Sequence, residues 1–100
     1  MRIISGKYRG RTIVPPRNLR ARPTTDFAKE NLFNVLGNLV DFKDIDVLDL
    51  FSSTGSISYE FCSRGAKSVT SVEVNSVHNA FIRKTARELG FANLYATHAN

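Results

Sequence analysis

The sequence predicts an α/β fold in which a parallel sheet carries flanking helices. An apolar run over residues 45–51 precedes a helical pattern over 56–64, and a second run over 68–74 precedes a pattern over 77–89. A third apolar run begins at Asn93. Strands that alternate with helices of this length are joined by right-handed crossovers, which makes the strands parallel in one sheet.

The N-terminal segment, residues 1–22, predicts a basic hairpin and arm ahead of this sheet. Runs at 2–4 and 12–14 read as two short strands, with the turn near Gly6 or Gly10. Two prolines then end the hairpin. A residue before proline avoids the helical region, so residues 20–25 should be extended.

A helix is expected to begin near Asp26, capped by Thr24 or Thr25. Apolar residues recur at steps of three and four and predict its buried face, which comprises Ala28, Leu32, Val35, Leu36 and Leu39. Gly65 and Gly90 follow the two later helical patterns and should end those helices.

Length and composition indicate one compact domain. One hundred residues with 42% hydrophobic and 23% charged residues are ordinary for a globular protein. No apolar run approaches the about 18 to 20 residues of a membrane span, and residues 1–6 lack the apolar core of a secretory signal. The single Cys62 has no partner for an internal disulfide. We therefore expect a cytoplasmic protein in which Cys62 is a buried structural thiol.

The positive charge is concentrated in the N-terminal segment. Seven of the 14 Lys and Arg residues precede the first acid, Asp26, and the rest of the chain carries seven bases against nine acids. Guanidinium groups form forked hydrogen bonds to phosphate oxygens, so a nucleic-acid partner is expected. A solvated tail is the alternative. The residues expected to face the nucleic acid are Lys7, Arg9, Arg11, Arg20 and Arg22.

The turn after the first predicted strand of the sheet is the candidate cofactor site. The strand runs into Asp49, and a Ser/Thr/Gly turn over 51–55 then opens a helix. Ligands of open α/β sheets sit beyond the carboxyl ends of the strands. Glu73 ends the next strand at about the spacing at which an acid meets ribose hydroxyls. Either acid alone could be a helix cap or a solvated strand end, but the pair favours a site.

The charge of Asp49 indicates which cofactor fits. A dinucleotide would place its pyrophosphate beside this carboxylate, with a repulsion of about 1 kcal/mol at 4 Å in bulk water and more in a dry cleft. S-adenosylmethionine (SAM) carries an ammonium and a sulfonium group, which the same carboxylate attracts. The sequence therefore favours SAM over NAD. The lack of a G-x-G-x-x-G run argues against a nucleotide-dependent oxidoreductase as well.

The chain resembles the bacterial small-subunit ribosomal RNA guanine-N2 methyltransferases of the RsmD type. The resemblance spans essentially all residues and rests on residues 1–11, 22–26 with Glu30 and 32–36, 49–51 with Thr54 and Gly55, and 63–66. It implies the N-terminal half of a Rossmann-like SAM-dependent methyltransferase fold, residues 23–100, preceded by the basic hairpin. The implied substrate is the exocyclic N2 amine of a guanine in small-subunit ribosomal RNA, as naked RNA, in the small subunit or in its assembly intermediate.

The resemblance also implies roles for single residues. Those implied to bind the cofactor are Asp49, Phe51, Ser53, Thr54, Gly55, Glu73 and Asn100. Glu73 would bind the ribose and Asn100 the adenine amine, while Thr24 would lie near the active site. The family usually has glycines where this chain has Ser53 and Ser58. A serine Cβ at these positions would crowd a ligand or require negative φ, or the hydroxyls would donate hydrogen bonds instead.

The catalytic loop of such amine methyltransferases, Asn/Asp-Pro-Pro-aromatic, is absent from these residues. All three prolines lie in the N-terminal segment, so the chain is expected to be a fragment with no catalytic residue of its own. A sheet that stops after its third strand should also expose a long open edge and half of its apolar helix faces. No metal site is expected, because the two histidines lack partners at ligand spacing. A DNA adenine-N6 methyltransferase and a non-catalytic nucleic-acid-binding module remain alternatives.

Overall fold

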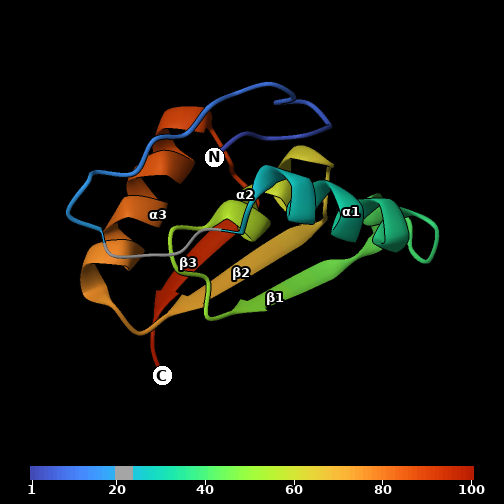
Figure 1. The fold of residues 1–100 in the computed structure, drawn as a ribbon. Coiled ribbons are helices and arrows are strands. Elements are labelled where there is room, and N and C mark those ends of the chain that lie inside the picture. The colour runs from blue at the N-terminus through green and yellow to red at the C-terminus, as the bar shows by residue number, and fades with distance from the viewer. Residues whose placement is uncertain (20–23) are drawn as a thin grey trace.

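A computed structural model describes residues 1–19 and 24–100 (Figure 1). The elements, in order, are α1 (Asp26–Gly37), the short 3-10 helix η1 (Phe42–Asp44), β1 (Asp46–Leu50), α2 (Ser56–Ser63), β2 (Ser68–Glu73), α3 (Ser76–Leu89) and β3 (Leu94–His98). Within the described residues the strands form one parallel sheet in the order β1-β2-β3. The predicted α/β fold class is confirmed.

The register of the sheet brings the carboxyl ends of the strands to one edge. Asp49 of β1 pairs with Ser71 of β2, and Glu73, two residues further along β2, pairs with His98 of β3. Side chains alternate between the faces of a strand, so Ser71 and Glu73 share one face. Both are buried under the helices. The two acids singled out in the sequence therefore lie at the same end of the sheet.

One face of the sheet carries the hydrophobic core. The helices and the N-terminal hairpin all lie on this side (Figure 1). The core consists of Ile3, Ile13, Tyr59, Cys62, Ala66, Val69, Ile82, Phe91 and Leu94. On the opposite face Leu48, Leu50 and Tyr95 are exposed, so the described part of the chain leaves that face of the sheet uncovered.

The N-terminal hairpin is shorter than the sequence predicted. Its two arms meet in a single antiparallel bridge between Arg2 and Thr12, flanked by hydrogen bonds from the Ile3 and Ile13 N–H groups. The segment instead binds to α2, because the Lys7 N–H donates to the Ser63 carbonyl at 2.8 Å. Gly6 has φ of 90°, and a Cβ there would overlap that carbonyl. Contacts with α2 therefore hold the hairpin together with its own short ladder.

Helix α1 begins as predicted but buries a different face. The Thr25 side chain caps it by accepting from the Ala28 N–H. The prediction of the buried face was wrong, because within α1 only Lys29 and Phe33 are buried. Of the predicted residues only Leu36 is half-buried. The others are exposed: Ala28, Leu32, Val35 and, beyond the end of the helix, Leu39. The reason is an ion pair: Lys29 points at the buried Glu60 of α2, which turns the leucine side of α1 outward.

The remaining local predictions agree with the structure where it describes the residues. Gly90, at φ of 73°, caps the C-terminus of α3 as expected. Burial raises the pKa of the Cys62 thiol to about 12, which fits a structural thiol. The predicted extended segment 20–25 lies largely outside the described residues. None of the described helices is both long and apolar enough to cross a membrane.

Candidate functional site

Asp49 lies near the end of β1, where the strand enters the turn before α2. Its Oδ2 accepts a hydrogen bond from the Ser58 hydroxyl at 2.6 Å, and its main-chain oxygen accepts from the Ser52 hydroxyl at 2.7 Å. Burial raises the pKa of the Asp49 carboxyl above its ordinary value, the Ser58 hydrogen bonds oppose this, and the negative charge of Glu73 adds to it. No cationic side chain of the described residues lies within ion-pair distance of Asp49. The carboxylate is thus partly desolvated and suited to a cationic ligand.

Glu73 ends β2 and ties the neighbouring loop to the sheet. Its Oε1 accepts from the Ser53 N–H at 2.6 Å and its Oε2 from the Asn75 N–H at 2.8 Å. Each carboxylate oxygen can accept more than one hydrogen bond, so capacity remains for a ligand hydroxyl. Glu73 therefore both shapes the loop and presents an acceptor at its edge.

The loop between β1 and α2 has an unusual backbone. Phe51, Ser53 and Gly55 have φ of 60°, 54° and 91°, all in the left-handed region. At Gly55 only glycine fits, because a Cβ would lie 2.6 Å from the Tyr59 hydroxyl. Ser53 takes the conformation that glycine would take. The expectation that a serine at this position requires negative φ was wrong, because the Glu73 hydrogen bond to its N–H fixes the loop.

Two hollows adjoin this loop and share Phe51, whose side chain is 88% exposed. The first, about 120 Å³, is lined by Thr24, Asp49, Phe51, Ser52, Ser53, Thr54, Ser56 and Ile57. The second, about 330 Å³ and mostly apolar, is lined by Leu50, Phe51, Val72, Glu73, Val74, Ala99 and Asn100. Six of the seven residues predicted to bind the cofactor line at least one of these hollows, and the seventh, Gly55, is a buried residue of the loop itself. Thr24 joins them as well.

Sequence reasoning missed part of this corner. Ser58 was noted only as a replacement for a glycine, yet its hydroxyl contacts the Asp49 carboxylate. Ser56, the first residue of α2, lines the smaller hollow. The signal that could have found them is their position: both fall in the first turn of the helix that follows the loop.

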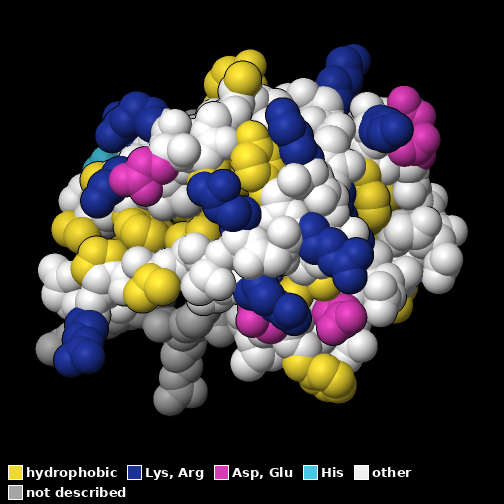
Figure 2. All heavy atoms as spheres, turned by 90° about the horizontal axis from the view of Figure 1, so that it is seen from above, with side chains coloured by type: hydrophobic (Ala, Val, Ile, Leu, Met, Phe, Trp, Pro, Cys, Tyr) yellow, Lys and Arg dark blue, Asp and Glu magenta, His cyan; other side chains and the backbone are white. Residues whose placement is uncertain are grey.

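The basic residues of the hairpin lie on the surface. Lys7, Arg9 and Arg11 are exposed, whereas Arg20 and Arg22 lie outside the described residues. Figure 2 views the hairpin side of the molecule and shows Lys and Arg side chains spread across it. The Tyr8 ring packs edge-on against Phe91 at 4.8 Å between ring centres, which holds the hairpin over the turn between α3 and β3.

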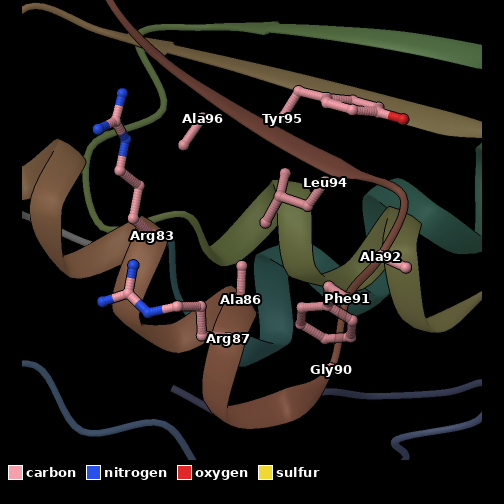
Figure 3. Close-up of a pocket in the computed structure, with 9 residues that line it drawn as sticks. All are labelled: Arg83, Ala86, Arg87, Gly90, Phe91, Ala92, Leu94, Tyr95 and Ala96. Atoms are coloured by element: carbon pink, nitrogen blue, oxygen red, sulfur yellow. The ribbon is translucent and has the colours of Figure 1, made fainter.

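A larger hollow lies at the other end of the sheet (Figure 3). It has a volume of about 570 Å³, and its polar rim comes from Arg83 and Arg87 of α3. It is open beside Leu94, where β3 begins, and contains none of the predicted site residues. Its size alone therefore does not make it the cofactor site. The described part of the chain contains no group of three or more His, Cys, Asp or Glu side chains placed to hold a metal ion.

Comparisons with known proteins find a matching family and several similar proteins. The family described as conserved hypothetical protein 95 matches residues 1–100. A ribosomal RNA small subunit methyltransferase D from Buchnera aphidicola is 35% identical to this chain. The match covers 100% of this chain and 50% of the relative. A solved Escherichia coli structure, provisionally described as a methyltransferase, has a TM-score of 0.86 at 30% identity, over 100% of this chain and 52% of its own.

More distant structures share the fold alone. A SAM-dependent methyltransferase from Aquifex aeolicus has a TM-score of 0.60 at 18% identity, over 68% of this chain and 37% of its own. The chain spans about half the length of the curated relatives it matches.

Proposed function

We propose, since this chain belongs to the RsmD-type family of conserved hypothetical protein 95, that it is the cofactor-binding half of a SAM-dependent RNA methyltransferase. The observation that carries the proposal is the corner where a partly desolvated Asp49 and the strand-ending Glu73 flank two adjoining hollows. The proposed target is the exocyclic N2 amine of a guanine in small-subunit ribosomal RNA. The name of the Buchnera relative supports the choice of this RNA.

The residues present fit SAM. Asp49, which has no cationic partner among the described residues, would attract the positive charges of the cofactor, with Ser53, Thr54 and Gly55 forming the loop around it. In the hollow of about 330 Å³ Glu73 would bind the ribose hydroxyls and Asn100 the adenine amine, with Phe51 between this hollow and the smaller one. Bound SAM supplies a methyl group on a sulfonium, which an amine can attack without a strong base.

The chain's own contribution to the reaction is position. Holding donor and acceptor in reacting geometry can remove about 7 to 11 kcal/mol of the barrier. Thr24 lines the same hollow as Asp49 and would face the target base. The Asn/Asp-Pro-Pro-aromatic loop that would accept from the target amine does not occur within residues 1–100, and we propose no catalytic residue among them.

RNA would bind across the hairpin. Lys7, Arg9 and Arg11 are exposed there, and we propose that Arg20 and Arg22 also bind RNA. The RNA would be that of the small subunit or of its assembly intermediate. The place of action would then be the cytoplasm, where bacterial ribosomes are assembled.

The test is methyl transfer from labelled SAM by the longer protein of which this chain is proposed to be the cofactor-binding half. Small-subunit ribosomal RNA and DNA compete as substrates, and mass spectrometry identifies the digested product. The proposal predicts N2-methylguanine in the RNA and none without SAM. Methyladenine in DNA would favour a DNA methyltransferase instead. Salt-sensitive RNA binding with no SAM binding would favour a non-catalytic nucleic-acid-binding module.

A further inference from the structure

Lys29 of α1 is a buried cation that contacts two other parts of the chain, the start of the hairpin and α2. Its side chain is 1% exposed, and that of Glu60 is fully buried. The Lys29 Nζ donates to the Arg2 carbonyl at 2.6 Å and to the Ser56 hydroxyl at 3.2 Å, and lies 3.5 Å from Glu60 Oε1. One ammonium group therefore joins α1, the start of the hairpin and the first residue of α2.

Glu60 completes the network on the hairpin side. Its carboxylate accepts from the Ile4 N–H at 2.8 Å, the Ser5 N–H at 3.1 Å and the Arg64 Nε at 2.8 Å. The carboxylate thus accepts from donors of the hairpin and of its own helix. Removing the Lys29 ammonium would leave the Arg2 carbonyl and the Ser56 hydroxyl without this donor.

The buried ion pair is not by itself evidence of a stabilising role, which leaves a positional role to consider. Burial lowers the pKa of Lys29, and the charge of Glu60 only partly offsets this. Well-packed apolar residues often replace buried ion pairs without loss of stability, so such a pair is weak support for a purely stabilising function. What an apolar side chain could not supply is a donor to both the hairpin and α2 at fixed positions.

The two ends of the network belong to the two proposed binding surfaces. Ser56 lines the smaller hollow together with Asp49 and Thr54. Arg2 begins the hairpin and forms the bridge with Thr12, next to the exposed Arg11. Lys29 itself lies outside both hollows and cannot touch either ligand directly.

We propose that Lys29 is a positioning residue that sets the RNA-binding hairpin and the cofactor loop relative to each other. This inference rests on the proposed function, since it names the residue that fixes the positions of the two proposed binding surfaces. Because Lys29 acts through Ser56 on one side and through the Arg2 carbonyl on the other, its loss should weaken the binding of both SAM and RNA. Loss of the Ser56 hydroxyl should weaken only the binding of SAM.

The experiment compares Lys29→Met, Ser56→Ala and the control Lys67→Met, which removes an exposed lysine outside the network. Dissociation constants for SAM and for a small-subunit ribosomal RNA transcript are measured at a temperature where circular dichroism shows each variant folded. Lys29→Met should raise both constants about fivefold or more, the loss expected for one hydrogen bond on each side. Ser56→Ala should raise only the SAM constant, and Lys67→Met neither by as much as twofold.

A purely structural Lys29 would lower the melting temperature of Lys29→Met and leave both constants within twofold of wild type, and that result overturns the proposal. If Lys29→Met does not fold, Ser56→Ala decides, because it keeps the buried charges: an unchanged SAM constant then overturns the proposal. Failure of the wild-type protein to bind SAM or RNA would instead refute the proposed function.

Discussion

The Ser53 N–H donates a 2.6 Å hydrogen bond to Glu73 Oε1, which ties the loop after β1 to the end of β2. The other Glu73 oxygen accepts from the Asn75 N–H, the residue that caps α3. A single carboxylate thus fixes the exits of two neighbouring strands. The edge of the sheet at which the cofactor is proposed to bind is therefore preorganised without a ligand.

Glu73→Gln should destabilise the protein. The amide keeps one acceptor oxygen but turns a donor toward the second N–H, which leaves a buried donor unsatisfied at a cost of about 1 to 3 kcal/mol. Chemical denaturation measures this loss. SAM affinity should fall with it, because the proposed ribose acceptor is weakened. An unchanged free energy of unfolding would show that the hydrogen bonds of these two N–H groups do not need the negative charge of Glu73.

Asp49→Asn should have the opposite effect on stability. The amide removes a desolvated charge while its oxygen still accepts from the Ser58 hydroxyl. We expect a higher melting temperature at neutral pH without ligand, together with SAM binding weakened about tenfold or more through loss of a charge pair. Calorimetry checks both quantities. A variant that binds SAM as tightly as wild type would contradict the role given to this carboxylate.

The pH dependence of SAM binding should follow Asp49. Burial raises its folded pKa above the ordinary 3.8, so the folded protein holds a proton that the unfolded chain has released. The contribution of this group to stability is full below the unfolded pKa and is lost as pH rises through the folded pKa. SAM affinity should increase over the same window, because the carboxylate becomes charged. SAM affinity measured from acid to neutral pH should show this rise in wild type and not in Asp49→Asn.

Ser53→Gly should raise SAM affinity by removing the Cβ beside the hollow. It also relieves a left-handed backbone that costs a non-glycine residue about 1 to 2 kcal/mol, partly offset by the greater freedom of glycine when unfolded. Ser53→Ala, which keeps the Cβ and removes only the hydroxyl, is the matched control. Equal or weaker SAM binding by the glycine variant would count against crowding and favour a hydrogen bond from the hydroxyl.

Gly6→Ala should release the hairpin from α2. The φ of 90° costs about 1 to 2 kcal/mol for any side chain, and overlap with the Ser63 carbonyl adds about 1 to 3 kcal/mol. Gly10→Ala is the control, since Gly10 has φ of 85° but nothing within 4 Å of a Cβ. Denaturation of both variants isolates the overlap. Equal losses of stability in the two variants would mean that the hairpin moves away from the Ser63 carbonyl at no cost.

How far the sequence predicts the fold depends on whether the signal is local. The strand-to-helix units, the Thr25 cap and the glycine end of α3 follow from neighbouring residues and are confirmed. The buried face of α1 does not, because it is set by Lys29 meeting Glu60 of another helix. Periodicity favoured the leucines, and no spacing rule shows an ion pair between distant elements.

The candidate site divides in the same way. The spacing of Asp49 and Glu73 along two strands indicated a shared corner, and the parallel register places both at one edge. The contacts of Ser58 and of the Ser53 N–H depend on the left-handed backbone of the loop. Sequence shows which residues occur there but not which way their donors point.

The measurement that tests the central claim most directly is a calorimetric titration of the protein with SAM and, in parallel, with NADH. The account predicts saturable binding of SAM that Asp49→Asn abolishes or greatly weakens, and no binding of NADH. Binding of NADH in place of SAM, or SAM binding indifferent to Asp49, would contradict it.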